Sequence, residues 1–225
     1  MQFIPSQHGF TFPNGFRGYA LPKFIRNRKE NWLLNQNKVL HGLCGGMCFG
    51  AYDFFLSNQK IPILKEAPAP TDQLYEYLYK RQNDSYGYCN YNILKFAQWM
   101  GLSKQEIQKR MNIELRKLLS QLDKQNLVIL GLITVKLSES LAIWKNHQVL
   151  AYSYNLSQSF NNSHYEISIY DPNLNRENNV ILKTNIDPNF DCVLLNQDDQ
   201  KYLRTIYGFF IIPYSYVKPP SFQLI

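Results

Sequence analysis

The order of hydrophobic patterns along the chain is the sequence feature that most limits its fold. In the first 125 residues, apolar side chains recur at helical spacing, as at Ile93, Phe96 and Met100. From Leu127 the pattern becomes a nearly continuous apolar run rich in branched residues, which is typical of a buried strand. Helices gathered in one half and strands in the other predict an α+β protein with an antiparallel sheet.

The second half is expected to form a sheet in which successive strands are joined by turns. Apolar segments alternate there with polar, turn-forming stretches such as residues 155–163 and 196–199. The predicted strands span residues 127–135, 147–154, 165–170, 180–183, 190–195 and 203–212. We expect the second and third of them to pair as a hairpin across the 155–163 loop.

The first half is expected to hold four or five helices. The predicted segments are 44 to about 57, 71–81, 93–101 and 103–124. Gly101 is predicted to close the third segment as a left-handed cap. Ser103 and Glu106 form a capping-box pattern at the start of the fourth, in which Asn112 marks a point where the helix could break.

Length and composition favour a single folded domain. The chain has 225 residues, 45% of them hydrophobic and 18% charged, which is ordinary for a globular protein. We interpret residues 1–225 as one domain with an irregular N-terminal arm (1–30), a helical half (31–125) and an antiparallel half (126–225). Aromatic rings are expected to dock the arm on the body. These rings belong to Phe3, Phe10, Phe12, Phe16 and Phe24.

Charge, termini and cysteines limit the partners and the compartment. The net charge of +7 is spread along the chain without a nucleic-acid motif, so we expect a solvated surface and no nucleic-acid partner. The N-terminus lacks a signal-peptide pattern, and no segment approaches the roughly 20 apolar residues of a membrane span. The four cysteines form no Cys-x-x-Cys pair, which favours reduced thiols. These features predict a cytoplasmic protein that does not enter a membrane.

Cys44 stands where a helix is expected to begin. Unpaired N–H groups at a helix N-terminus stabilise a thiolate, which is the reactive form of cysteine. Gly45 and Gly46 follow without Cβ atoms, and we expect them to let a substrate backbone come close. Cys48 lies on the expected core face and is interpreted as a packed, inert thiol. The alternative interpretation makes Cys44 one more buried structural cysteine.

His147 and Asp171 are predicted to lie side by side at one edge of the sheet. His147 opens one expected strand, and Asp171 directly follows the next. In a hairpin, the start of the first strand lies beside the end of the second. A carboxylate on one imidazole nitrogen fixes the tautomer, so that the other nitrogen can take a proton from a thiol. A surface histidine and an ordinary Asp-Pro-Asn turn are the alternatives.

The three motifs together resemble the papain-like cysteine peptidases. The resemblance is carried by Cys-Gly-Gly-Met-Cys at residues 44–48, by His147 in His-Gln-Val-Leu-Ala-Tyr, and by Asp171 with the proline after it. The chain is most similar to the bacteriocin leader-processing peptidases and their relatives. This resemblance, over residues 30–212, implies a papain-like fold with a nucleophile on a central helix. It also implies Cys44 as nucleophile, His147 as general base and acid, and Asp171 as orienting carboxylate, without cofactor or metal.

The chain departs from the pattern of these families at two points. Where the leader-processing branch usually places a glutamine that completes the oxyanion hole, this sequence has Lys38. Gln36, Asn37 and His41 are the alternatives for that side chain, and the glycines at 45 and 46 are further substrate-binding candidates. The papain-type Cys-Gly-x-Cys-Trp order is also absent. Cys48 is therefore kept as a second, less favoured nucleophile.

The sequence leaves more than one function open. A cysteine hydrolase would cleave a peptide or small-molecule amide or acyl substrate through a thioester. An acyl or amide transferase would use the same triad with an amine in place of water. A catalytically inactive pseudo-peptidase would bind a peptide or a partner in the cleft. A zinc site built from His41, Cys44 and Cys48 with Cys89 or His147 is a less favoured alternative.

Overall fold

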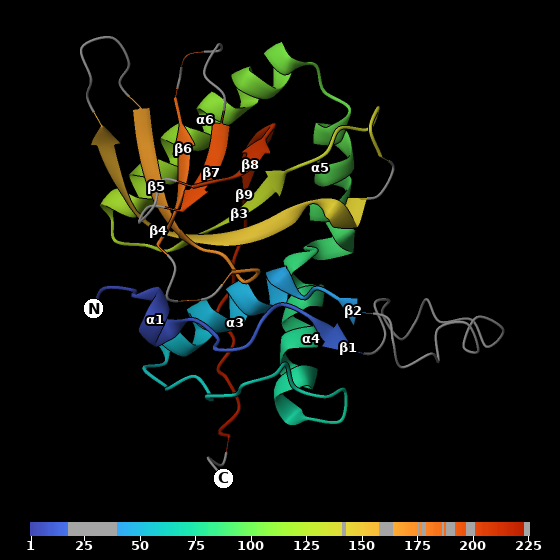
Figure 1. Cartoon of the computed structure of the whole chain (residues 1–225), viewed down its shortest axis with the longest axis vertical. Coiled ribbons are helices and arrows are strands. Elements are labelled where there is room, and N and C mark those ends of the chain that lie inside the picture. The colour runs from blue at the N-terminus through green and yellow to red at the C-terminus, as the bar shows by residue number, and fades with distance from the viewer. Residues whose placement is uncertain are drawn as a thin grey trace, which may run out of the picture.

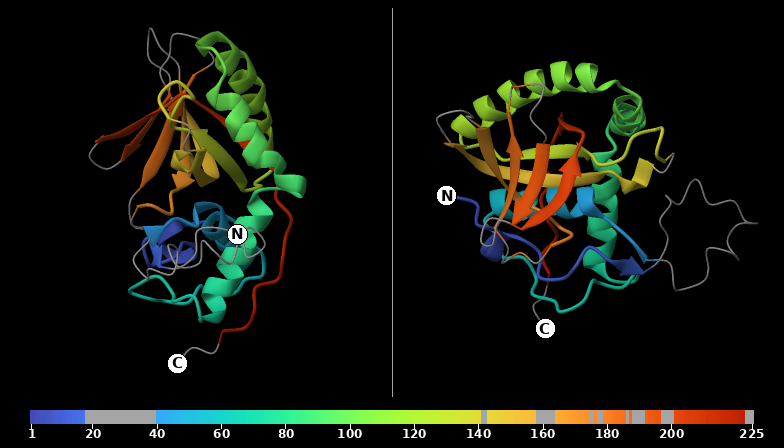
Figure 2. Two further views of the ribbon diagram at one scale, coloured as in Figure 1. Left: turned by 90° about the vertical axis from the view of Figure 1, so that its right-hand side faces the viewer. Right: turned by 45° about the horizontal axis from the view of Figure 1, so that its top comes forward.

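The computed structural model describes residues 1–17, 40–140, 143–157, 164–174, 176, 179–185, 187, 192–196 and 201–222. Its main parts are a layer of helices and a seven-stranded antiparallel sheet, so the α+β class is confirmed (Figure 1). Most of the helical layer precedes the sheet in the chain and lies at one end of it. The longest helix, α6, instead runs along a face of the sheet (Figure 2).

The helices follow the predicted segments closely. They are α1 (Pro5–His8), α3 (Cys44–Leu56), α4 (Gln73–Ser85), α5 (Tyr91–Met100) and α6 (Lys104–Asp123), with short 3-10 turns η2 (Tyr88–Asn90) and η3 (Ile143–Lys145). The capping box of Ser103 and Glu106 is present at the start of α6. The predicted break is wrong, because α6 continues through Asn112, whose side chain accepts a hydrogen bond from Gln108 at 3.3 Å. Gly101 is not left-handed, since its φ is −89°.

The sheet has the strand order β8-β7-β6-β5-β4-β3-β9, and every neighbouring pair is antiparallel. Its strands are β3 (Val128–Ile133), β4 (His147–Ser157), β5 (His164–Tyr170), β6 (Val180–Thr184), β7 (Cys192–Asn196), β8 (Tyr202–Ile206) and β9 (Gly208–Ile212). A separate two-residue pair joins β1 (Phe16–Arg17) to β2 (Leu40–His41).

The predicted single strand over residues 203–212 is wrong. The chain there forms β8 and β9, which lie at opposite edges of the sheet although only Tyr207 separates them. The Tyr207 N–H donates to the carbonyl of Ile133 at 2.8 Å, which starts the pairing of β9 with β3. The sheet must therefore curl so that its two edges meet at this residue. The curl brings the β8 edge round toward the end of β5, where the candidate site lies.

Helix α3 is the buried centre of the helical layer. Every residue from Gly45 to Phe54 is buried, and the helix contacts α1, α4 and β4. The contact with α4 is very close, because a Cβ atom at Gly46 would lie 2.2 Å from the carbonyl oxygen of Leu78. The glycine run after Cys44 therefore lets two helices approach each other. This packing fixes the start of α3 relative to α4 and β4.

The N-terminal arm packs against the body through its aromatic rings. Of the five Phe rings expected to dock, Phe3, Phe10, Phe12 and Phe16 are buried, while Phe24 lies outside the described residues. The arm is less irregular than predicted because it contains α1 and β1. Its backbone reaches the end of β5, where the Phe10 N–H donates to the hydroxyl of Tyr170 at 3.2 Å. Buried rings thus hold residues 1–17 beside the predicted site.

The C-terminal segment after β9 runs back along the helical layer (Figure 1). Two buried side chains hold it there. Asp53 of α3 accepts hydrogen bonds from the Tyr214 hydroxyl at 2.6 Å and the Val217 N–H at 3.0 Å. Arg81 of α4 donates to the carbonyl of Ser215 at 2.7 Å, and its Nε lies 2.7 Å from the Asp53 carboxylate. One ion pair therefore links α3, α4 and the C-terminal segment.

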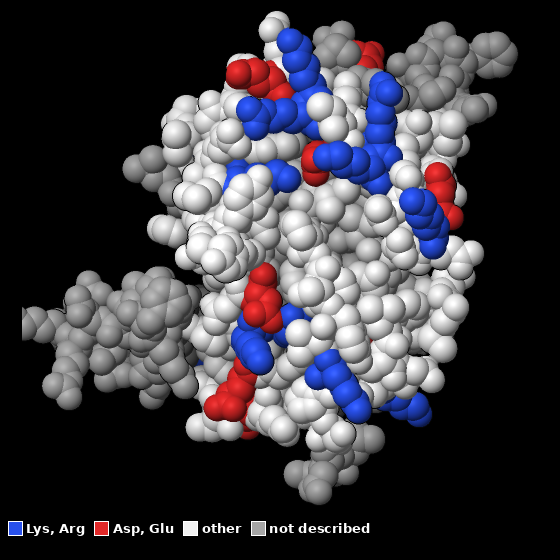
Figure 3. All heavy atoms as spheres, turned by 180° about the vertical axis from the view of Figure 1, so that it is seen from behind, with Lys and Arg blue, Asp and Glu red and all other residues white. Residues whose placement is uncertain are grey.

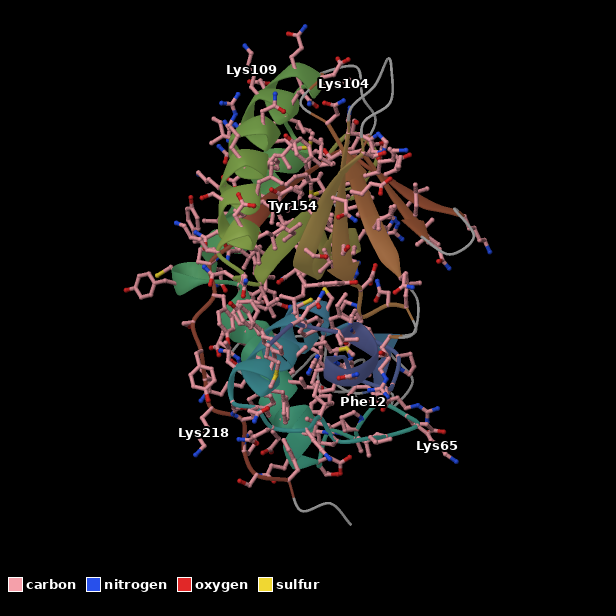
Figure 4. The ribbon with its side chains drawn as sticks, turned by 90° about the vertical axis from the view of Figure 1, so that its left-hand side faces the viewer. Phe12, Lys65, Lys104, Lys109, Tyr154 and Lys218 are labelled. Carbon is pink, nitrogen blue, oxygen red and sulfur yellow. The ribbon has the colours of Figure 1, made fainter. Side chains whose placement is uncertain are left out.

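Positive charge is spread over the outer surface. On the face opposite to that of Figure 1, Lys and Arg side chains gather over the upper half, with acidic side chains among them (Figure 3). Lys109 points outward from α6, on the side away from its buried apolar residues (Figure 4). The absence of a nucleic-acid partner stays a prediction. In the described ranges, no helix has the length and apolar character that crossing a membrane requires.

Candidate active site

Cys44 is the first residue of α3, as the sequence predicts. The turn before it is held by two hydrogen bonds. The Leu43 N–H donates to the Asn14 side-chain oxygen at 2.6 Å, and the Leu43 carbonyl accepts from the Met47 N–H at 2.8 Å. The Cys44 side chain is partly exposed and lines a cavity of about 790 Å³. The thiol is thus fixed at a helix N-terminus and open to a cavity.

His147 and Asp171 meet as the hairpin pattern predicts. β4 and β5 pair antiparallel, with Leu150 opposite Tyr170, so that the start of β4 lies beside the residues after β5. The His147 Nε2 is 2.6 Å from the Asp171 carboxylate, and both side chains are buried. The Cys44 thiol lies close enough to the imidazole to help raise the pKa of His147. Cys44, His147 and Asp171 therefore form one connected group.

The charges in this group support one another. Burial disfavours the charged imidazole, but the charge and hydrogen bond of Asp171, together with Cys44, outweigh it and raise the pKa of His147 to about 10. Burial likewise opposes ionisation of Asp171, yet the adjacent imidazolium lowers the pKa of that carboxyl below its usual value. The arrangement therefore favours an imidazolium beside a carboxylate, with the thiol in contact with it. Such a group can store and return a proton while the sulfur acts as a nucleophile.

Two asparagines that sequence reasoning missed complete the support of His147. The Asn173 side-chain nitrogen lies 3.3 Å from each ring nitrogen of His147, and the Asn173 backbone N–H donates to Asp171 at 2.8 Å. The Asn173 side-chain oxygen accepts from Asn14 at 2.8 Å. Because Asn14 also holds the Leu43 N–H, one chain of hydrogen bonds joins the N-terminal arm, the nucleophile turn and the imidazole.

The other cysteines have separate surroundings. Cys48 is buried and donates to the carbonyl of Gln148, and burial raises the pKa of its thiol well above the usual value. Cys192 is buried in β7, whereas Cys89 is exposed in η2. Cys48 is thus the packed thiol that the sequence suggests, and it offers little as a nucleophile. Within the described part of the chain, no group of three or more His, Cys, Asp or Glu side chains could hold a metal ion, so nothing there favours the zinc alternative.

The residues expected to bind substrate have different surroundings in the structure. His41 lines the cavity and its ring contacts the Tyr75 hydroxyl at 3.3 Å, whereas Gln36 and Asn37 lie outside the described residues. The two glycines do not open toward a substrate as expected. A Cβ atom at Gly45 would lie 2.2 Å from the Ser85 hydroxyl oxygen, and the Gly46 N–H already donates to the Gln82 side chain at 2.9 Å. They serve the packing of α3 instead.

Tyr86, Trp144 and Arg204 also line the cavity, and no sequence motif selects them. Tyr86 directly follows α4, and Arg204 belongs to β8. Trp144 lies in η3 with an exposed fraction of 81%, which is unusual for so large an apolar side chain. The sequence shows a tryptophan three residues before the predicted catalytic histidine, but its exposure is evident only in the structure.

The chain was compared with known protein families, curated proteins and solved structures. Neither a family model nor a curated protein nor a solved structure matched it. What the fold and site define by themselves is an α+β protein with a curled antiparallel sheet and a Cys-His-Asp group on a cavity.

Proposed function

We propose that the protein is a papain-like cysteine hydrolase that cleaves a peptide or amide bond through a thioester on Cys44. The observation that carries the proposal is the buried His147–Asp171 pair, 2.6 Å apart, with the thiol of a helix N-terminus on the imidazole. Hydrogen bonds support both the turn before the cysteine and the ring of the histidine, which favours an active site over an inactive remnant of one. The resemblance in the sequence motifs points the same way.

The proposed reaction proceeds in two halves. In the first, the Cys44 sulfur attacks the substrate carbonyl carbon, and the imidazolium of His147 gives its proton to the leaving amine, so that a thioester remains. In the second, neutral His147 takes a proton from water, hydroxide attacks the thioester carbon, and the acid product leaves with Cys44 restored as thiolate. Asp171 stays ionised throughout and holds the imidazole in orientation.

Selective alkylation of Cys44 is the experiment that tests this proposal. We expect iodoacetamide at about pH 6 to label Cys44 at least about tenfold faster than exposed Cys89, because an ordinary thiol is almost fully protonated there. His147→Ala should abolish the difference. The measurement is the labelling rate of each cysteine by mass spectrometry. Buried Cys48 and Cys192 report on folding, since they stay unlabelled in an intact variant.

A matched control is His164→Ala, which removes another buried histidine of the same sheet and should leave Cys44 labelling unchanged. Equal labelling of Cys44 and Cys89 in the wild type, unaffected by His147→Ala, would contradict the proposed activation. An activated Cys44 that consumes an acyl donor only when an amine is added would instead favour the transferase alternative.

The charge of the cavity gives a prediction about the substrate. Arg204 lines it, lies near enough to Asp171 to lower the pKa of that carboxyl, and forms no ion pair with any described residue. Lys145 also lines the cavity, and the described lining contains no Asp or Glu. We therefore expect N-succinylglycine p-nitrophenyl ester, which is anionic, to be preferred over the neutral N-acetylglycine ester. The expected preference in kcat/KM is about twofold to fivefold, as for an exposed ion pair.

Arg204→Glu should reverse this preference, and about 0.5 M salt should weaken it in the wild type. Arg116→Glu on α6 is the matched control, because it makes the same charge change on an exposed residue that does not line the cavity. An effect of equal size in both variants would mean that the net charge of the protein, and not Arg204, sets the preference.

A further inference from the structure

We infer that the Tyr86 hydroxyl is the side-chain donor of the oxyanion hole, together with the backbone N–H of Cys44. The inference rests on the proposed hydrolase function and names a residue that the sequence motifs do not select. Tyr86 and Cys44 line the same cavity. A hydrolase that forms a tetrahedral intermediate needs preorganised donors aimed at the developing negative oxygen.

The backbone of Tyr86 is held rigidly at the end of α4. Its N–H donates to the carbonyl of Asn83 at 3.1 Å, and its own carbonyl accepts from the Asn92 N–H at 2.9 Å. The next residue, Gly87, has a φ of 76°, a left-handed value that suits glycine and turns the chain away from the helix. The tyrosine ring therefore projects from a fixed point rather than from a flexible loop.

The hydroxyl of Tyr86 has a proton to give at neutral pH, and the Gln82 side chain lies beside it. Burial, opposed in part by Gln82 and aided by the nearby Cys44, raises the pKa of Tyr86, which keeps the phenol protonated at neutral pH.

The same glutamine connects Tyr86 to the nucleophile helix. The Gln82 oxygen accepts from the Gly46 N–H at 2.9 Å, so this amide of the first turn of α3 is already used. Within the described part of the chain, by contrast, no acceptor is bonded to the Cys44 N–H. Gln82 thus lies between Tyr86 and the first turn of α3. Cys44 and Tyr86 both line the cavity, and in this inference their N–H and hydroxyl are the two donors offered to an oxyanion.

The experiment compares two reactions of the same sulfur. Acylation of Cys44 by p-nitrophenyl acetate passes through an oxyanion, whereas alkylation by iodoacetamide displaces iodide at a saturated carbon and forms none. Tyr86→Phe removes only the hydroxyl. We expect this variant to slow acylation by about 10²-fold and to leave the alkylation rate of Cys44 within about twofold of the wild type.

Tyr88→Phe is the matched control, since Tyr88 lies two residues along with an exposed fraction of 92% and does not line the cavity. It should change neither rate. Wild-type acylation in Tyr86→Phe would overturn this inference while leaving the hydrolase proposal intact. Equal loss of acylation and alkylation would also overturn it, because Tyr86 would then act on the sulfur. A wild-type protein whose Cys44 is neither acylated nor selectively alkylated would overturn the proposed function itself.

Discussion

Replacing Asp171 by asparagine is expected to lower the rate of Cys44 acylation by p-nitrophenyl acetate by about 10⁴-fold, the loss seen when a triad carboxylate becomes an amide. The carboxylate can only accept, so it holds the proton of His147 on Nε2 and leaves Nδ1 for the thiol. An asparagine can donate to Nε2 instead and would stabilise the opposite tautomer. The geometry would survive, but the imidazole could no longer exchange a proton with the sulfur.

Glu166→Gln is the matched control for this variant. Glu166 also lies in the β5 region and pairs with a histidine, His164, at 3.1 Å, but neither residue lines the cavity. Acylation should be unchanged there. Similar losses in Asp171→Asn and Glu166→Gln would mean that general disturbance of the sheet, rather than the tautomer of His147, explains the effect.

The pH dependence of stability provides a second measurement on the same pair. The pKa of His147 rises from its ordinary 6.5 to about 10 on folding. The resulting stabilisation is fully present below about pH 6.5 and is lost as pH rises through about 10. The free energy of unfolding of the wild type should therefore fall across this window by up to about 1.4 kcal/mol per pH unit relative to Asp171→Asn. Urea unfolding at several pH values measures the slope.

The hairpin that places His147 beside Asp171 could be predicted because its signals are local. Strand patterns on either side of a turn-rich stretch predict that the start of the first strand, with His147, lies beside the end of the second, with Asp171. Asn173 could not be predicted in this way. The β4–β5 pairing ends with Leu150 opposite Tyr170, and Asn173 lies beyond it in the turn after β5, whose path no local pattern predicts.

The remaining cavity residues depend on packing between distant elements. Tyr86 reaches the cavity because α4 packs closely on the glycines of α3, and Arg204 reaches it because the sheet curls. Neither contact leaves a pattern in the residues around it. For the glycines at 45 and 46 the prediction itself was wrong. The local sequence suggested access for a substrate, but a neighbouring helix occupies the space beside them. Sequence reasoning therefore found the groups that perform the proposed chemistry, but not the groups that surround them.

Asp53→Asn is expected to lower the free energy of unfolding by up to about 3 to 5 kcal/mol, the cost of removing one partner of a buried ion pair. Arg81 has no exposed side-chain surface and would face a neutral amide, with only the partly exposed Asp84 left as a charged partner. The Tyr77 hydroxyl, which donates to Asp53 at 2.6 Å, would lose a charged acceptor as well. Because the carboxylate also holds Tyr214 and Val217, the C-terminal segment should become sensitive to limited proteolysis.

Asp84→Asn is the matched control, because it removes a carboxylate that pairs with the same Arg81 but is partly exposed. Asp84 is also 2.6 Å from Arg81, but its side chain is 36% exposed. Its loss should cost less than about 1 kcal/mol, as for a solvated ion pair. The two variants are compared by their midpoints of urea unfolding. The comparison holds when the dependence of the unfolding free energy on urea concentration is the same in both. Equal destabilisation would show that the buried carboxylate has no special role. A large effect confined to Asp53 would mean that one ion pair fixes α3 to α4, and hence the cysteine to the tyrosine at the cavity.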